Sequence, residues 1–326
     1  MSSSGSAGRV VVAGSLNLDL GLAVPRLPRS GETVSASGRQ DGPGGKGLNQ
    51  AVAAARAGAS TAFVGCVGDD DAGRVLLGAL TAAGIDVGDV RTLPDTASGV
   101  AVVAVDDGGA NCIVVVAGAN GRVEAEQVEA VALGADDVLV AQGEIPAAAT
   151  LAFLQAGRRV GARTVLNLAP FHPPSVELLQ ATSILVVNET ELLDLVEAFG
   201  RVPDGTDPGP DGLAVVVAAE RLLSLGVDAV LLTLGAAGMV AVRSEGLVAE
   251  PAHRVTVVDT TGAGDAVVGV LAAELVRGAE LDVAMRTASA AAALVVGRRG
   301  ASTAMPTRAE TEAVLRASAD SPRSGA

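Results

Sequence analysis

The stretch VTVVDTTGAGDAVVGVL, residues 255–271, contains three successive patterns. Its first four residues are apolar and predict a buried strand. Small polar residues and glycines follow, and residues 266–276 then predict a helix. Glycines let a backbone turn sharply and approach a ligand, and the free N–H groups at a helix start attract anions. The stretch therefore predicts a strand, an anion-binding turn and a helix.

Asp265 lies in the first turn of this predicted helix, where the helix dipole favours an ionised carboxylate. Phosphoryl transfer requires donors for the charge on the moving group and an acceptor for the proton of the attacking hydroxyl. The turn offers both. The alternative is that Asp265 only stabilises the helix start, and the spacing alone leaves both interpretations open.

Composition narrows the class of protein. The chain has 326 residues, 49% of them hydrophobic, which is enough for a large core. A net charge of −14 and an aromatic content of 1% argue against a nucleic-acid partner. No apolar run approaches the ~18 residues of a membrane span. We therefore expect neither a nucleic acid nor a membrane as partner.

The ends and the cysteines suggest a cytoplasmic protein. Residues 1–8 are rich in Ser and Gly without an apolar segment, so we expect a disordered tail rather than a signal peptide. We expect a second tail at residues 321–326. Cys66 and Cys112, the two cysteines, each lie in an apolar strand-like run and are expected to be buried, reduced thiols.

The middle of the chain alternates between strand and helix patterns, which predicts an α/β fold with helices on both faces of a mostly parallel sheet. Such a doubly wound fold has three layers, and we expect it over residues 9–320. Residues 202–212 are rich in Pro, Gly and Asp and predict a surface loop. The remaining segments predict strands at 9–14, 61–68, 137–141, 164–168, 184–187 and 229–234, a ribbon at 239–243 and 247–250, and helices at 71–83, 147–159, 175–181, 189–199, 213–225, 284–296 and 307–317.

A smaller sheet is predicted beside the main one. Residues 22–40 contain short alternating pieces such as GETVSASG, and residues 97–105 and 111–116 predict a hairpin. Together these segments, about 20–42 and 97–118, would form a lid that excludes water from a reaction.

The segment DGPGGKGLN, residues 41–49, matches the spacing G-x-G-x-x-G. No apolar strand precedes it, and Pro43 lies within the turn, so a dinucleotide site and hence a dehydrogenase are disfavoured. The segment also lacks the spacing of a Walker A loop. It predicts a glycine-rich turn before a helix at 48–57, with N–H groups that can bind sugar hydroxyls.

Polar residues recur where the predicted strands end. Asn17 and Asp19 follow the first strand, Glu144 follows another, and Asn188 follows a third. In a doubly wound sheet these ends meet at one rim, near Asp265, where ligands bind. The alternatives are an ordinary helix cap at Asn188 and a polar alternation on an edge strand at Asn17 and Asp19.

Two of these segments also resemble a known family. DTTGAGDAVVG, residues 259–269, closely matches the C-terminal signature of the ribokinase-like (PfkB) sugar kinases. GGKGLNQAVAAARAGA, residues 44–59, is similar to the N-terminal signature, particularly that of the ribokinase branch. The resemblance continues in register from Val10 to about Pro306.

The resemblance implies roles for individual residues. Asp265 would be the catalytic base, and Gly262, Ala263 and Gly264 would form the anion hole. The sugar would be bound by Asn17, Asp19, Gly45, Lys46, Asn49, Glu144 and Asp265. The nucleotide would contact Asn188, Thr233, Leu234, Gly235, Ala236, Ala237, Gly238, Gly264 and Ser289.

The resemblance also implies two metal ions. Glu191, with Asn188, would handle Mg²⁺ through water or phosphate. An activating K⁺ would be bound by Asp259, Thr261, Val295, Arg298, Gly300 and Ala304, mostly through backbone carbonyls. Ala304 departs from the serine of many relatives, so its part in the K⁺ site is an open question.

The activity implied is ATP-dependent phosphorylation of the primary hydroxyl of D-ribose, giving ribose 5-phosphate, by a homodimer. Fructose, 2-keto-3-deoxygluconate or a nucleoside is the alternative substrate, although the scarcity of aromatics disfavours a nucleoside. A sugar- or nucleotide-binding protein without turnover is the alternative of another class.

Overall fold

A nine-stranded sheet forms the centre of the computed structural model, which describes residues 8–199 and 213–320. Seven neighbouring strands of this sheet run parallel, and an antiparallel ribbon of two strands completes one edge. The spatial order is β13 (Gly246–Glu250), β12 (Met239–Arg243), β11 (Ala229–Thr233), β10 (Ile184–Asn188), β9 (Arg163–Asn167), β8 (Val138–Gln142), β1 (Val10–Ala13), β4 (Thr61–Gly68) and β5 (Asp86–Leu93).

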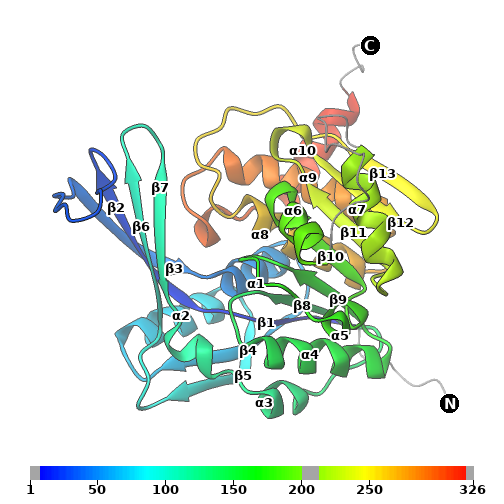
Figure 1. Cartoon of the computed structure of the whole chain (residues 1–326), viewed down its shortest axis with the longest axis horizontal. Coiled ribbons are helices and arrows are strands. Elements are labelled where there is room, and N and C mark those ends of the chain that lie inside the picture. The colour runs from blue at the N-terminus through cyan, green and yellow to red at the C-terminus, as the bar shows by residue number, and fades with distance from the viewer. Residues whose placement is uncertain (1–7, 200–212, 321–326) are drawn as a thin grey trace.

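Helices cover both faces of this sheet (Figure 1). In β1, Val10 and Val12 join one apolar core while Val11 and Ala13 join the other, because successive side chains of a strand point to opposite faces. The first core packs under α1 (Lys46–Arg56), α2 (Asp71–Ala82), α8 (Ala263–Val276) and α9 (Leu281–Val296), with α10 (Arg308–Asp320) against α9. The second core packs under α3 (Ala125–Glu129), α4 (Ala147–Val160), α5 (Val176–Gln180), α6 (Glu189–Ala198) and α7 (Leu213–Ser224). The predicted three-layer, doubly wound α/β fold is thus confirmed.

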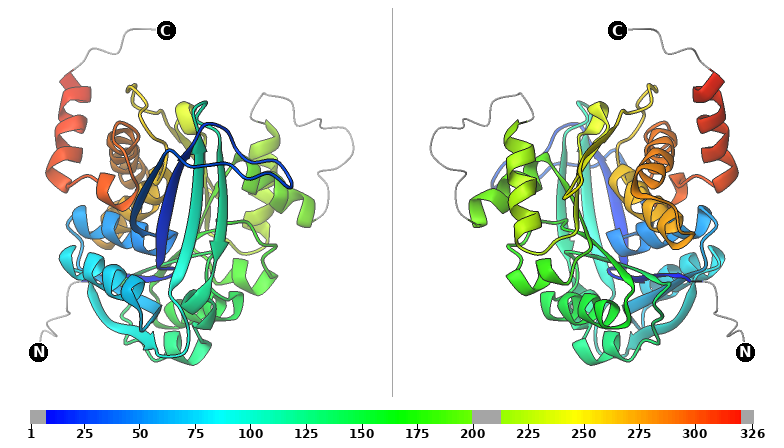
Figure 2. Two further views of the ribbon diagram at one scale, coloured as in Figure 1. Left: turned by 90° about the vertical axis from the view of Figure 1, so that its left-hand side faces the viewer. Right: turned by 90° about the vertical axis from the view of Figure 1, so that its right-hand side faces the viewer.

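A separate four-stranded sheet stands beside the main body (Figure 1) and faces the viewer in the left view of Figure 2. Its order is β3 (Gly38–Gly44), β2 (Asn17–Val24), β6 (Gly99–Asp106) and β7 (Asn111–Val116). Only three residues separate β1 from β2, so the first strand of the second sheet leaves directly from an interior strand of the main sheet.

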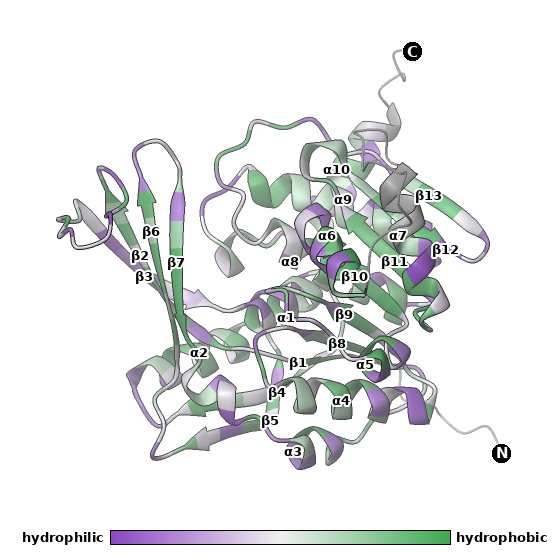
Figure 3. Ribbon diagram, viewed as in Figure 1, coloured by the Kyte–Doolittle hydropathy of each residue, from purple (hydrophilic) through white to green (hydrophobic). Residues whose placement is uncertain are grey.

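The edge strand β7 is apolar but exposed along its whole length (Figure 3). Its Ile113 and Val114 are 54% and 58% exposed. Cys112 is exposed as well, which corrects the expectation of two buried thiols, whereas Cys66 is buried. The apolar pattern that predicts a strand does not show which face of it is covered.

The strand predicted at residues 255–258 is wrong. Residues 251–260 form no strand, and Val255, Val257 and Val258 are exposed. The segment pairs with none of the described strands, although β13 forms an edge of the sheet. The N–H groups of Val258 and Asp259 instead bind the carbonyl of Val296 at the end of α9, at 2.7 and 3.2 Å.

The second sheet also differs in detail from the prediction. GETVSASG forms no strand apart from Gly38, and the glycine-rich DGPG forms the end of β3. Pro43 is accommodated there because β3 is an edge strand and one of its sides needs no N–H donor. The strand β5, which contains Asp86 and Asp89, was not predicted because its composition is polar.

Three predicted segments lie outside the described residues: the tail at 1–8 except Gly8, the loop at 202–212, and the tail at 321–326. Within the described ranges, no helix has the length and apolar character needed to span a membrane.

Candidate active site

The site begins where the strand order of the main sheet reverses. After β1 the chain adds β4 and β5 on one side, and it later adds β8 on the other. Ligands of open α/β sheets bind beyond the carboxyl ends of the strands at such a reversal. At this point the Ser15 hydroxyl donates to Oε2 of Glu144, and the Lys46 N–H donates to the same oxygen at 2.9 Å. The ends of β1 and β8 and the start of α1 are thereby joined.

Asp265 lies in the first turn of α8 and is only 7% exposed. Two consecutive residues of α1 donate to its carboxylate: Asn49 Nδ2 to Oδ2 at 2.9 Å and Gln50 Nε2 to Oδ1 at 3.0 Å. Burial raises the pKa of Asp265, while the charge of Lys46 and the two amide donors act to lower it. The group is therefore a buried carboxylate whose charged form depends on its neighbours.

Glycines shape the start of α8. Gly262 immediately precedes the helix and has φ 78°. A side chain at this position would also press against Ala301, because its Cβ would lie 3.1 Å from the Ala301 Cα. Gly264, in contrast, faces open space that a side chain would occupy. The first N–H groups of a helix have no acceptor within the helix, so those of Gly264 and Asp265 are available to a ligand.

A cleft of about 230 Å³ opens at this helix start. The residues around it come from α1, from the ends of β9, β10 and β11, and from α8, so segments distant in sequence share one wall. The lining residues are Lys46, Asn167, Ala169, Val186, Val187, Asn188, Glu191, Thr233, Thr260, Gly262, Gly264 and Asp265.

Asp19 of β2 faces the same region from the second sheet. Its carboxylate lies over Gly44, since a Cβ on Gly44 would be 2.0 Å from Oδ2. Burial raises the pKa of Asp19 to about 7, and the nearby carboxylates of Glu144 and Asp265 add to the effect. Three carboxylates thus share one pocket.

The structure brings the predicted sugar residues into one cluster. Asn17 is buried, and its Oδ1 accepts from Asn120 Nδ2 at 2.7 Å, so its own amide nitrogen is the group that can donate to a ligand. Asn49 Oδ1 is buried and accepts no hydrogen bond from the described residues. Gly45 has φ 92° and packs against Ser15 and Asn17, so it joins the glycine-rich turn to this cluster.

Asn188 and Glu191 form a reciprocal capping box at the start of α6. Asn188 Oδ1 accepts the Glu191 N–H at 2.9 Å, and Glu191 Oε2 accepts the Asn188 N–H at 2.8 Å. The ordinary interpretation of Asn188 as a helix cap is therefore correct, yet both residues also line the cleft. Burial raises the pKa of Glu191, against the opposing effects of the Asn188 N–H and Lys46.

The other predicted nucleotide residues lie beyond β11. Thr233 lines the cleft, while Leu234 and Gly235–Ala237 (η2) form the turn that leads to β12. Gly238 packs against residues 250–252, and the Ser289 hydroxyl of α9 donates to the Pro251 carbonyl at 3.1 Å. Gly238 and Ser289 therefore meet around the segment 250–252, whereas Thr233 lies in the cleft.

The predicted cation residues gather near the end of α9. Asp259 Oδ1 accepts the N–H and the hydroxyl of Thr261 at 2.9 and 2.6 Å, and Oδ2 accepts the Gly300 N–H at 3.0 Å. The Val295 carbonyl accepts the Arg298 N–H at 2.9 Å. Burial alone would raise the pKa of Asp259, but these hydrogen bonds together lower it. The donor set is entirely oxygen, which suits a large monovalent cation.

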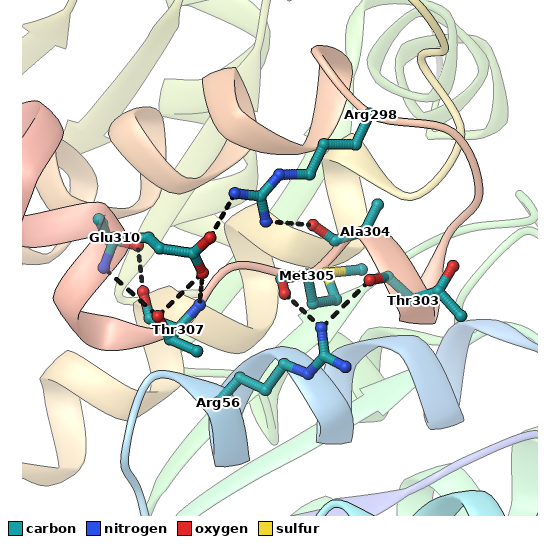
Figure 4. A network of polar contacts seen from close by, with 8 residues as sticks. Arg56, Arg298, Thr303, Ala304, Met305, Thr307 and Glu310 are labelled. Carbon is teal, nitrogen blue, oxygen red and sulfur yellow. Dashed lines mark hydrogen bonds and ion pairs between the residues drawn. The ribbon is translucent and has the colours of Figure 1, made fainter.

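Two guanidinium groups bind the carbonyls of the same loop (Figure 4). Arg298 donates to the Ala304 carbonyl at 3.3 Å and pairs with Glu310, while Arg56 of α1 donates to the carbonyls of Thr303 and Met305 at 3.2 and 2.6 Å. The turn η3 (Ser302–Ala304) is therefore fixed from two sides. The carbonyl of Ala304, whose part in the K⁺ site was an open question, already has a cationic partner.

Sequence reasoning missed several buried amides behind the site. Gln50 donates to both Asp265 and Asn167. Asn120 accepts the Leu16 N–H and donates to the Asn17 side chain. Gln50 carries the one available signal, because it is a polar residue in an otherwise alanine-rich helix directly after Asn49. Asn167 and Asn120 give none, since their partners are remote in sequence.

Comparison with known proteins agrees with this geometry. The model of the pfkB family of carbohydrate kinases matches residues 7–308. The chain is 35% identical over 305 residues to the ribokinase of Haemophilus influenzae, covering 93% of this chain and 96% of that protein. It is 32% identical to the deoxyribokinase of Salmonella typhi over 300 residues, or 91% and 95% of the two chains. The structure of Arabidopsis thaliana ribokinase complexed with ribose and ATP superposes with a TM-score of 0.84 at 32% identity, over 95% of this chain and 99% of that one.

The raised pKa of Asp19 predicts how this residue affects stability. Ionising Asp19 costs more free energy in the folded than in the unfolded protein. The resulting loss in the free energy of unfolding grows from about pH 4 to about pH 7 and is constant above that pH. Asp19→Asn should therefore increase the free energy of unfolding by about 2 kcal/mol at pH 8, allowing for solvent screening, and by little at pH 4. Urea unfolding at both pH values measures this. Asp41→Asn, on the neighbouring strand, is the control and should show no such gain, and an equal gain at pH 4 and pH 8 for Asp19→Asn would contradict the argument.

Proposed function

Because the chain belongs to the pfkB family of carbohydrate kinases, we propose that it transfers the γ-phosphoryl group of ATP to the primary hydroxyl of D-ribose, giving ribose 5-phosphate. The observation that carries the proposal is the position of Asp265. Its buried carboxylate lies at the start of α8, beside free N–H groups and within reach of the cleft.

Asp265 acts as general base. Its carboxylate accepts the proton as the sugar oxygen attacks phosphorus, and the N–H groups at the start of α8 bind the charge that develops on the phosphoryl oxygens. Lys46, the basic residue in the lining, adds a positive charge beside both Asp265 and Glu191. Since the phosphoryl group forms few bonds to protein during transfer, alignment in the cleft supplies much of the rate.

Mg²⁺ bound with ATP would neutralise phosphate charge at the Asn188–Glu191 side of the cleft. The described residues contain no cluster of three His, Cys, Asp or Glu able to hold a metal by themselves. The ion would therefore arrive with the nucleotide, and Glu191 would meet it through water or phosphate. The nucleotide base would extend towards residues 233–238 and Ser289.

The sugar pocket favours a polyhydroxylated ligand. Asp19, Glu144 and the buried Asn49 Oδ1 are acceptors, while Asn17 and Lys46 offer donors, so ring hydroxyls can be bound on several sides. The second sheet, which carries Asn17 and Asp19, would act as the lid and exclude water that competes with the sugar for the phosphoryl group.

Turnover of ATP with a panel of sugars tests the function. D-Ribose should give the highest kcat/KM, ahead of 2-deoxyribose, fructose, 2-keto-3-deoxygluconate and nucleosides. Asp265→Asn should lower kcat by at least ~10² and leave ribose binding measurable by calorimetry, because it removes the proton acceptor while the other sugar residues stay in place. Ribose binding without ATP turnover in the native protein would instead indicate a binding protein.

We propose that K⁺ binds at Asp259, Thr261 and the carbonyls of Val295, Arg298 and Gly300, without the Ala304 carbonyl, which Arg298 already binds. The ion would not touch the phosphates. It would fix the backbone that leads into Gly262–Gly264, so that the N–H groups are already directed at the developing charge.

KCl should therefore raise kcat severalfold more than an organic-cation chloride at equal ionic strength, with a smaller change in the KM for ribose. Asp259→Ala should abolish the difference. K⁺-dependent stabilisation of the native protein, followed by its thermal midpoint, gives a second measurement. Equal rates in the two salts would remove K⁺ from the mechanism.

We also propose a cytoplasmic homodimer formed through the second sheet. The exposed apolar strand β7 supports this pairing, since contiguous apolar surface of this kind favours association. Both cysteines are unpaired, as in a reducing compartment.

Ile113→Lys should convert the dimer into a monomer, because it places a charge in the centre of that apolar surface. Sedimentation of the two proteins at equal concentration measures the change. The matched control is Leu247→Lys, which charges an exposed leucine on the edge strand β13 of the main sheet and should leave the dimer intact. A native protein that sediments as a monomer would refute the pairing.

A further inference from the structure

A chain of buried amides connects Asp265 to the main sheet, and one of its members, Asn167, also lines the cleft. Gln50 is fully buried and donates through Nε2 to Asp265 Oδ1 and to Asn167 Oδ1, at 3.0 Å each. Its Oε1 accepts from Gln142 Nε2 at 2.8 Å. Gln142 belongs to β8 and Asn167 to β9, so the chain connects the central sheet to the catalytic carboxylate.

The hydrogen bonds determine which way the Gln50 amide points. If its oxygen and nitrogen were exchanged, the oxygen would face the carboxylate of Asp265 and the oxygen of Asn167, and the nitrogen would face the donor of Gln142. All three contacts would then lose their complementary partner. Only the observed orientation gives Asp265 a donor from this side.

We propose that Gln50 is a positioning residue of the phosphoryl transfer, held by Gln142, which keeps the Asp265 carboxylate ionised and turned toward the sugar hydroxyl. The inference rests on the proposed function and adds to it a residue that does not touch the substrate. The two amides that donate to Asp265 differ in this respect. Asn49 belongs to the sugar cluster and keeps an acceptor, Oδ1, without a partner among the described residues, whereas Gln50 is fully buried and both its polar atoms are already hydrogen-bonded to protein.

Other charged groups also face Asp265. Lys46 approaches from α1, Glu144 from the end of β8, and Asp19 from β2 of the second sheet. Since Asp19 titrates near pH 7 and belongs to the sugar cluster, its effect is expected in ribose binding. Measuring kcat at saturating ribose separates the titration of Asp265 from that of Asp19.

Gln50→Met keeps the length of the side chain and removes its donor. It should lower kcat about tenfold and move the acid limb of the pH profile of kcat upward by about one pH unit, because the ionised form of Asp265 loses a hydrogen bond. The KM for ribose should change less than about threefold. Gln142→Met leaves the Gln50 donor in place but removes the hydrogen bond that holds it. It should therefore move the acid limb of the kcat profile upward by less than Gln50→Met does.

The matched control is Gln127→Met. Gln127 is a partly buried glutamine that also bridges two segments, through the carbonyls of Gly65 and Asp89 at 2.8 and 3.0 Å, but it lies away from the site. It should lower the thermal midpoint without moving the acid limb. If neither Gln50→Met nor Gln142→Met moves the limb more than Gln127→Met does, Gln50 is a structural residue and the proposal is wrong. An inactive native protein would overturn the kinase assignment itself, whereas an active native protein with unchanged variants overturns only the role of Gln50.

Discussion

The burial of one negative charge at the start of α8 is the constraint on which the site depends. A carboxylate removed from water needs compensating partners, and Asp265 obtains them from α1 through Asn49 and Gln50. This requirement fixes α1 against α8, two helices that pack together on the same face of the main sheet. Gly269 of α8 makes the close packing feasible, because a Cβ there would meet the Gln50 carbonyl at 2.4 Å. The apolar packing of the two helices and the polar site are thus parts of one arrangement.

The charges of the empty site lower the free energy of unfolding, and the same charges favour ligand binding. Asp19, Glu144 and Asp265 repel one another in a partly buried pocket, and burial raises the pKa of Asp19 and of Asp265. An unliganded protein gains nothing from this cluster. A polyhydroxylated ligand and Lys46 can relieve it by supplying donors, so the same charges that weaken the empty pocket would strengthen binding.

The two sheets contribute different parts of the site. The main sheet is buried on both faces and supplies the strand ends around the cleft, whereas the second sheet leaves from β1 and carries Asn17 and Asp19. Asn120, just after β7, binds the backbone of Leu16 and the side chain of Asn17. It therefore joins two of the four connections between the second sheet and the main body, the one before β2 and the one after β7. Movement of that sheet would reorient Asn17 at the same time.

The sequence by itself determined the α/β class, most strands and helices of the main sheet, the hairpin β6–β7 and the helix start at Asp265. These depend on local periodicity and turn residues, which neighbouring positions encode. Tertiary structure alone decided that residues 255–258 are an exposed loop, because a β-branched run becomes a strand only where it pairs with another strand. It also decided that β7 is uncovered, and that Gln50, Gln142 and Asn167 meet behind Asp265. These polar contacts join residues up to 215 positions apart, and nothing in the local pattern of any one of them specifies its partner.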